Sequence, residues 1–146
     1  MNPEDFDLGG FLPYLLNQAA EESSLSFQRV YKDRYGMLRT EWRVLFHLGL
    51  YGRMTASEIG MRSKMHKTKI SRAVSALEDR RFLTRERDTG DRRQEYLELT
   101  NAGRAAYDDL REVARKHDAV LVATLSDEEE QTLRTVLRRL AKMDPA

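Results

Sequence analysis

A run of five cationic side chains with no acid between them lies near the middle of the 146-residue chain. The run consists of Arg62, Lys64, Lys67, Lys69 and Arg72. Closely spaced cations neutralise phosphate groups and bind nucleic acid by releasing its condensed counterions. A charged run is also the usual composition of a solvated helix face. The residues between the cations are needed to choose between these two interpretations.

The second half of this run falls on a segment, about 67–80, whose apolar residues have helical spacing. They are Ile70, Ala73, Val74 and Leu77, the i, i+3, i+4, i+7 pattern of a helix packed on a core. At about 100° per residue, the residues on the opposite side are Thr68, Arg72, Ser75 and Asp79. Arginine matches the paired acceptors of guanine, and hydroxyl groups bond to base edges or phosphates. This favours nucleic acid, and the candidate contacts are Lys67, Thr68, Lys69, Ser71, Arg72 and Ser75.

A shorter helix is predicted just before it, at about 56–63. Thr55 and Glu58 have the spacing of a capping box, in which each side chain bonds to the backbone N–H of the other residue. The two segments together therefore predict a helix, a tight turn and a second helix. Three methionines in and around the first helix, Met54, Met61 and Met65, are interpreted as core residues.

A two-stranded ribbon is predicted next, with strands at 82–85 and 96–99. The turn between the strands carries Arg92 and Arg93 close to Asp88 and Asp91. An arginine at the tip of a ribbon can enter the minor groove of DNA, where the negative potential is strongest. The alternative is an exposed loop on which the two aspartates neutralise the two arginines. The neighbouring basic helix favours the first interpretation, with Asp91 supporting Arg93.

The ribbon carries a motif that resembles a known family. Residues 91–103, DRRQEYLELTNAG, are similar to the D-x-R-x5-L-T…G wing signature of the MarR family of winged helix-turn-helix bacterial transcription regulators. The resemblance extends to residues 67–74, 77–78 and 40–45. It implies a mostly α fold with a small β-wing: a winged helix-turn-helix module, about 40–100, on a helical dimerisation scaffold, about 8–36 and 101–144, in one domain spanning 1–146.

The chain departs from this family at two positions. His66 stands where relatives usually have Asp or Ser, just before the recognition helix. Arg81 stands where they usually have Gly, just after it. Glycine at that place adopts the left-handed conformation that ends a helix. Arg81 therefore predicts either some strain or a different helix end.

Charge and composition agree with a local DNA-binding module in a small globular protein. The net charge is only +1, but residues 55–98 carry +3 and the remainder −2. A chain of 146 residues with 40% hydrophobic composition can bury a core as one domain. The absence of cysteine excludes disulfides and Cys-based zinc sites and fits a reducing cytoplasm. No apolar run has the length of a membrane span, and the acidic start is unlike a signal peptide, so a cytoplasmic location without membrane contact is expected.

Long amphipathic helices are expected at both ends of the chain. The first spans about 11–34, and the next, capped by Thr40, spans about 41–50. After the ribbon, a helix at about 100–124 precedes a last helix that begins with a capping box of Ser126 and Glu129. The apolar stripes at the two ends can bury each other within one chain. The better fit is an intertwined symmetric homodimer, which the family resemblance also implies.

Catalytic motifs are missing from the sequence. There is no glycine-rich phosphate loop and no nucleophile elbow, so neither an enzyme nor a cofactor is expected. His47, His66 and His117 are scattered and lack metal-ligand spacing, and no metal is expected. Two other classes remain open. They are a winged helix that binds only protein, and a metal-dependent regulator using His47, His117 and Glu41.

Arg43 and His47 form a polar seam on the otherwise apolar helix 41–50. The family resemblance implies a pocket for a small aromatic or phenolic acid near this helix, to which Trp42, Arg43, Phe46 and His47 would contribute. The alternative is structural, because a polar group on a buried helix needs a partner. Arg43 would then pair with Glu21, Glu22 or Asp33.

Overall fold

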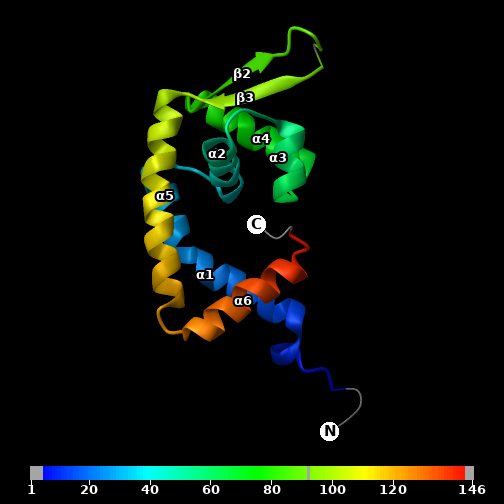
Figure 1. The fold of residues 1–146 in the computed structure, drawn as a ribbon, viewed down its shortest axis with the longest axis vertical. Coiled ribbons are helices and arrows are strands. Elements are labelled where there is room, and N and C mark those ends of the chain that lie inside the picture. The colour runs from blue at the N-terminus through cyan, green and yellow to red at the C-terminus, as the bar shows by residue number, and fades with distance from the viewer. Residues whose placement is uncertain (1–4, 92, 144–146) are drawn as a thin grey trace. The chain divides into compact units, whose positions relative to one another are not determined.

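The computed structural model describes residues 5–91 and 93–143 and is mostly helical with one small antiparallel sheet (Figure 1). The elements in chain order are η1 (Leu8–Gly10), α1 (Leu12–Tyr35), α2 (Arg39–Tyr51), β1 (Met54–Thr55), α3 (Ala56–Ser63), α4 (Lys67–Asp79), β2 (Leu83–Arg87), β3 (Glu95–Leu99), α5 (Asn101–Val122) and α6 (Asp127–Leu140). The chain forms two compact units, residues 1–113 and 114–146, whose boundary falls within α5. The predicted fold class is confirmed.

Helix α2 supplies the centre of the first unit's core. Its Val44, Leu45 and Leu48 are almost fully buried. On another side, Phe46 makes an edge-to-face contact with Phe27 of α1, with ring centroids 6.3 Å apart, and with Tyr107 of α5 at 5.2 Å. Such aromatic contacts add packing energy beyond their area. Helix α2 thus joins α1 and α5 to the rest of the unit.

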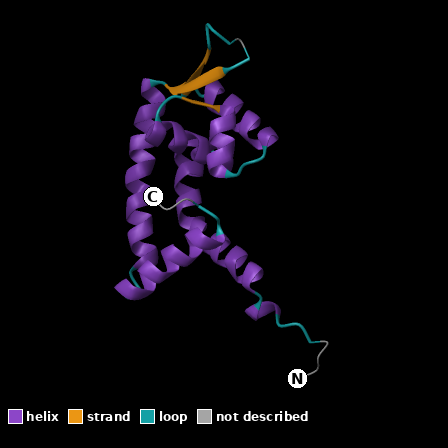
Figure 2. Cartoon of the chain, turned by 45° about the vertical axis from the view of Figure 1, so that its right-hand side comes forward, coloured by secondary structure: helices purple, strands orange, loops and turns teal. Residues whose placement is uncertain are grey.

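The helix-turn-helix forms as the sequence predicts. Helix α3 begins and ends at the predicted residues, and α4 ends one residue earlier than predicted. Ile70, Ala73, Val74 and Leu77 of α4 are buried, which leaves the opposite face of the helix outward. Figure 2 shows α3 and α4 below the sheet.

The sheet has the strand order β1-β3-β2, and both pairs are antiparallel. In the β2–β3 hairpin, Leu83 pairs with Leu99 and Arg87 pairs with Glu95. The hairpin is the predicted ribbon, with the first strand displaced by one to two residues and the second beginning one residue earlier. Strand β1 has only two residues and was not predicted, because so short a strand has no periodicity of its own.

Two predicted helix caps need correction. Thr40 does not cap α2, which begins at Arg39 after Leu38; there the Glu41 carboxylate accepts the Leu38 N–H at 3.2 Å. At α3 the Thr55 hydroxyl does accept the Glu58 N–H at 3.1 Å, as predicted. The Glu58 carboxylate, however, accepts the Thr55 hydroxyl rather than its N–H. Thr55 is also the last residue of β1, opposite Tyr96, so its backbone belongs to the sheet.

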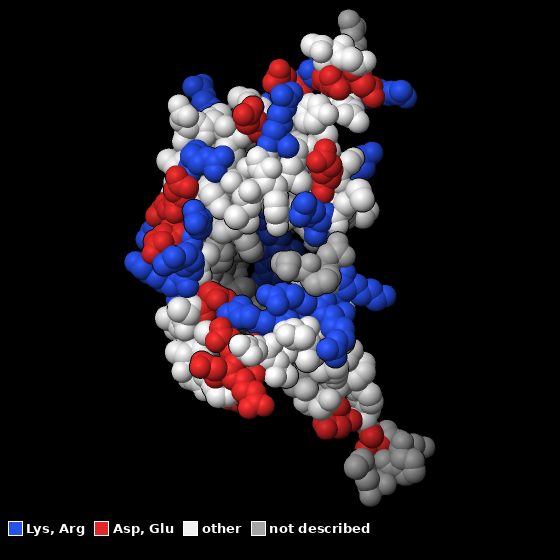
Figure 3. All heavy atoms as spheres, viewed as in Figure 1, with Lys and Arg blue, Asp and Glu red and all other residues white. Residues whose placement is uncertain are grey.

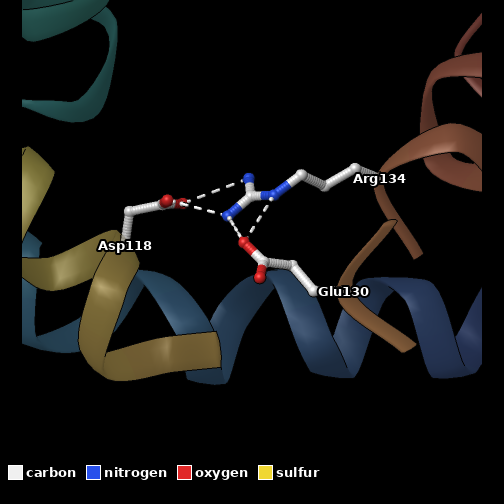
Figure 4. Close-up of polar contacts among 3 residues, drawn as sticks. All are labelled: Asp118, Glu130 and Arg134. Atoms are coloured by element: carbon white, nitrogen blue, oxygen red, sulfur yellow. Dashed lines mark hydrogen bonds and ion pairs between the residues drawn. The ribbon is translucent and has the colours of Figure 1, made fainter. Parts of the chain in front are cut away.

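The second unit is a helical hairpin made by the end of α5 and by α6. The predicted capping box is present, since Ser126 accepts the Glu129 N–H at 3.1 Å and Glu129 accepts the Ser126 N–H at 2.9 Å. Arg134 of α6 reaches Asp118 of α5 through both terminal nitrogens and also bonds Glu130 (Figure 4). The Asp118 bond is the main reason why the pKa of Arg134 is raised. These contacts tie the two helices together.

The apolar side chains of α6 lie outside this hairpin. Leu133, Val136, Leu137 and Leu140 recur at i, i+3, i+4 and i+7, and all four are exposed. A stripe of this kind on a charged helix is typical of a face that packs against another element or another chain. Throughout the described part of the chain, no helix is long and apolar enough to cross a membrane.

Candidate nucleic-acid interface

The outward face of α4 carries the predicted cationic and hydroxyl side chains. Lys67, Thr68, Lys69, Ser71 and Arg72 are all exposed. Within the described residues, the side chains of Lys67, Lys69 and Arg72 form no ion pair or hydrogen bond. They are therefore free to bind phosphates and base edges.

The start of α4 is capped by His66. Its Nδ1 accepts the N–H of Thr68 at 3.3 Å, which requires a neutral ring with the proton on Nε2. A side-chain acceptor at this place satisfies one of the free N–H groups of the first turn. His66 thus performs the capping role of the Asp or Ser usual in the family that the sequence resembles, without placing a negative charge beside the cations of α4.

Two members of the basic run have a different environment. The guanidinium of Arg62 stacks on the ring of Tyr51, 4.0 Å from its centroid. Lys64 has a left-handed backbone, with φ 57°, and ends α3. Arg62 of α3 thus contacts the end of α2, and Lys64 ends α3. The exposed cations of α4 form the core of the candidate interface.

Ser75 lies at the junction of α4 with the wing. Its hydroxyl accepts a bond from Arg85 of β2 at 3.1 Å, and Arg85 also pairs with Glu78 of α4 at 3.1 Å. Arg85 therefore fixes the wing to the recognition helix. The sequence did not single out Arg85, because nothing in the local pattern joins a strand residue to a helix seven to ten positions earlier.

The wing tip is organised by aspartate side chains. Asp91 accepts the backbone N–H of Arg93 at 3.0 Å and forms an ion pair with its guanidinium at 3.5 Å. Asp88 accepts the N–H of Gly90 at 3.1 Å. The Arg93 side chain is 95% exposed, so it projects from a turn that is held in place. Arg92 lies outside the described residues. Figure 3 shows blue and red atoms interspersed around the wing at the top of the view.

The second residue after α4 adopts the conformation that usually calls for glycine. Arg81 has φ 62°, in the left-handed region, and its N–H bonds to the carbonyl of Glu78 at 2.8 Å. A side chain in this region costs about 1–2 kcal/mol, so the first of the two sequence interpretations, strain at Arg81, is correct.

Replacing Arg81 by glycine is expected to stabilise the protein. Relief of strain is partly offset by the greater entropy of glycine in the unfolded chain, which leaves a gain of about 0.5–1 kcal/mol. Urea unfolding of Arg81→Gly checks this. Arg81→Asn should show a smaller gain, because asparagine tolerates the conformation less well than glycine, and a loss of stability in Arg81→Gly would contradict the strain.

The polar seam of α2, formed by Arg43 and His47, is half-buried, and one of its hydrogen bonds joins the two residues. His47 Nδ1 lies 2.6 Å from the carbonyl oxygen of Arg43, and because a carbonyl oxygen only accepts, this nitrogen donates. The Arg43 guanidinium lies 6.0 Å from the ring centroid of Trp42. Within the described residues Arg43 forms no ion pair with an acid. The structural partners considered from the sequence, Glu21, Glu22 and Asp33, therefore do not pair with it.

An open cavity of about 560 Å³ lies on the winged module, away from this seam. Its walls come from α3, α4 and the sheet, with an apolar floor that includes Ile70, Val74 and Leu97. Met61, at its edge, is 82% exposed, so interpreting Met61 as a core residue was wrong, although Met54 is buried. No group of three or more potential metal ligands occurs among residues 5–91 and 93–143.

Comparison with known proteins gives consistent matches. A MarR family model matches residues 35–94. The MarR family transcriptional regulator SPO1453 from Silicibacter pomeroyi DSS-3 is 31% identical, with a TM-score of 0.80 over 94% of this chain and 98% of that one. The uncharacterized HTH-type transcriptional regulator YwaE from Bacillus subtilis is 24% identical over 126 residues, which cover 86% of this chain and 74% of YwaE.

A further solved structure shares the fold at lower identity. BpsR from Bordetella bronchiseptica, whose DNA binding is regulated by 6-hydroxynicotinic acid, has a TM-score of 0.86 at 20% identity, over 96% of this chain and 99% of that one. The members of the family, SPO1453 and YwaE among them, are transcriptional regulators and not enzymes. With its wing motif, its helix-turn-helix and its mostly helical fold, the chain belongs to the MarR family of winged-helix transcriptional regulators.

Proposed function

We propose that this regulator is a homodimeric repressor that binds a pseudo-palindromic DNA duplex and responds to a small aromatic acid. The observation that carries the DNA-binding part is the outward face of α4, where Lys67, Lys69 and Arg72 are exposed and have no described partner. In this proposal α4 enters the major groove and Arg93 at the wing tip enters the flanking minor groove. The protein acts as one domain on chromosomal DNA in the cytoplasm.

The homodimer is supported by apolar surface at both ends of the chain. In the first unit Phe6, Leu8, Phe11, Leu12 and Leu15 are exposed, and the second unit exposes the stripe of α6. Soluble monomers rarely expose large contiguous apolar patches. A symmetric dimer covers such patches and presents two recognition helices to successive major grooves, about 34 Å apart.

The helix and the wing are expected to contribute differently to DNA binding. Arg72→Ala should cost about 1–3 kcal/mol on the cognate duplex and much less on a scrambled one, because a bidentate base contact is lost. Arg93→Ala should weaken binding to both duplexes and lower the salt slope by roughly one per site. Asp91→Ala should reproduce part of the Arg93→Ala effect, since it releases the turn without removing the arginine.

The measurement is a set of binding curves at several salt concentrations. The cognate duplex is one that the wild-type protein selects from a random pool. Arg111→Ala is the control, because Arg111 is an exposed cation of α5 remote in sequence from α4 and the wing. If Arg93→Ala lost only sequence preference and kept the wild-type salt slope, the assignment of the wing to the minor groove would be wrong.

The effector part of the proposal concerns the seam on α2. Arg43 has no described acidic partner and lies beside Trp42 and close in sequence to Phe46 and His47, so the seam offers a cation among aromatic rings. The shared fold of BpsR, regulated by 6-hydroxynicotinic acid, supports a small aromatic acid as the effector class. A ligand that favours one arrangement of the recognition helices shifts the population away from the DNA-binding form.

Arg43→Met is expected to abolish the response to an aromatic acid and to leave DNA affinity nearly unchanged. Hydroxybenzoic and hydroxynicotinic acids serve as probes. The fluorescence of Trp42, the only tryptophan of the chain, reports binding of the acid. Titration with a labelled duplex reports DNA affinity, and release of that duplex by the acid reports the response. Arg39→Met, one turn earlier on the same helix, is the control. Failure of Arg43→Met to fold would show that Arg43 is structural.

A further inference from the structure

We propose that Arg80, just after the recognition helix, is a positioning residue for DNA binding. Its guanidinium group joins the end of α4 to the end of α1 and the start of α2, and it acts on DNA affinity without touching DNA. The proposal rests on the proposed function, because it assumes that α4 binds DNA.

The first contact is with the last carbonyl groups of α1. The final carbonyls of a helix have no partner within it and carry the negative end of the helix dipole. One terminal nitrogen of Arg80 donates to the Tyr35 carbonyl, and the other donates to the Gly36 carbonyl at 2.7 Å. Gly36 ends α1 with φ 63°. A Cβ atom at Gly36 would lie 3.4 Å from both terminal nitrogens, so the guanidinium packs directly against this end of α1.

The second contact is with a buried acid at the start of α2. Glu41 is 4% exposed, and among the described residues it is the one buried charged side chain. Its Oε1 lies 3.6 Å from Nε of Arg80 and has no hydrogen-bond partner, while Oε2 accepts the Leu38 N–H. A buried carboxylate needs a nearby countercharge. Arg80 supplies this countercharge, so each of its three guanidinium nitrogens has a partner: the Tyr35 carbonyl, the Gly36 carbonyl or Glu41.

The end of α1 is held in turn by α5. Asp109 accepts the Tyr35 hydroxyl at 2.6 Å and pairs with Arg34 at 2.7 Å. Burial and the bond to Asp109 raise the pKa of Tyr35 to about 12, and the Tyr35 bond lowers the pKa of Asp109. Asp109 is therefore charged and the Tyr35 hydroxyl neutral near neutral pH. A continuous set of polar contacts thus runs from α5 through the end of α1 to Arg80.

This arrangement matters because a dimer must present two recognition helices at a fixed separation. The helices α1 and α5 belong to the proposed dimerisation scaffold, and Arg80 attaches α4 to them at its C-terminal end. Loss of the guanidinium frees that end to rotate, so more of the population holds α4 in unproductive orientations. Affinity then falls, but the number of phosphates neutralised in the bound state does not change.

The test compares Glu41→Gln with the double variant Glu41→Gln/Arg80→Gln on the duplex selected by the wild-type protein. Both variants avoid an unpaired buried charge, and glutamine can still accept the Leu38 N–H. Glu41→Gln keeps the two bonds from Arg80 to α1, so it is the reference against which loss of the Arg80 guanidinium is measured. The double variant should bind the duplex roughly tenfold more weakly than Glu41→Gln does, with an unchanged salt slope and an intact dimer. Arg81→Asn, the matched loss of one cation at the next residue, should bind like the wild type.

Two results would overturn the positioning role. Equal affinity of the double variant and Glu41→Gln would make Arg80 merely structural, and a salt slope reduced by about one per site would make it a phosphate contact. If the double variant does not fold, Arg80→Lys replaces it. Lysine keeps a charge beside Glu41 but cannot bond both carbonyls and Glu41, so its affinity and salt slope distinguish the same three roles. If the wild type itself shows no salt-dependent binding, the proposed function fails instead.

Discussion

Gly103→Ala is expected to destabilise the protein by about 3 kcal/mol or more. Gly103 lies in the first turn of α5, against the backbone of Phe82 between α4 and β2. A Cβ atom at Gly103 would lie 1.9 Å from the Phe82 carbonyl oxygen and 2.8 Å from its carbon. Backbone atoms cannot move aside as the end of a side chain can. The same carbonyl also accepts the Thr100 N–H at 3.0 Å, so any shift breaks a second contact.

Urea unfolding of Gly103→Ala and Gly60→Ala gives the comparison. Gly60 is also helical, but a Cβ atom there meets the terminal methyl of Ile70 at 2.9 Å, and that methyl can rotate. The gain in helix propensity on replacing glycine by alanine is about 1 kcal/mol, so Gly60→Ala should stay close to the wild type. Equal stability of the two variants would show that α5 does not approach Phe82 as described.

Leu137→Asp is expected to convert the proposed homodimer into a monomer and to lower affinity for the selected duplex by at least a hundredfold. Leu137 lies in the centre of the exposed stripe of α6 and is 40% exposed within the single chain. The charge therefore has little cost in the isolated chain and a large cost in a buried apolar interface. A monomer also loses the effective concentration that links two half-sites, which contributes about 10²–10⁴ in affinity.

Sedimentation at micromolar concentration and duplex titration measure the two effects. Thr135→Asp is the control, because at about 100° per residue it lies on the opposite side of α6, and it should remain dimeric with wild-type affinity. Circular dichroism establishes that both variants are folded. A dimeric Leu137→Asp protein, or a wild type that sediments as a monomer, would exclude α6 from the dimer interface.

Local patterns predicted the elements of the winged module well. The capping residue Thr55 and the apolar spacing of Ile70 and Leu77 are signals within one or two turns of a helix, and α3 and α4 begin where these signals place them. Prediction failed at the start of α2, where a different residue from the expected one bonds the free backbone N–H. Thr40 looked like a cap, but Glu41 bonds the Leu38 N–H and begins α2 earlier.

The contacts that position the candidate site were beyond sequence reasoning. Arg85 and Arg80 bond to groups that become neighbours only when β2 and the end of α1 pack against α4. The exposed cations of α4 could be predicted because burial of one helix face determines the direction of the other. For Ser75 the same argument gave the correct face but could not reveal its bond to Arg85.

The most direct test of DNA binding by α4 and the wing is the salt dependence of wild-type binding to the selected duplex and to a scrambled one. Phosphate contacts from Lys67, Lys69 and Arg93 of both protomers would give a slope of log K against log salt of roughly −5. Affinity for the selected duplex should then fall roughly a thousandfold between about 50 and 200 mM salt, and it should exceed affinity for the scrambled duplex at every concentration. A slope near zero, or equal affinity for both duplexes, would contradict sequence-specific DNA binding and favour a winged helix that binds protein.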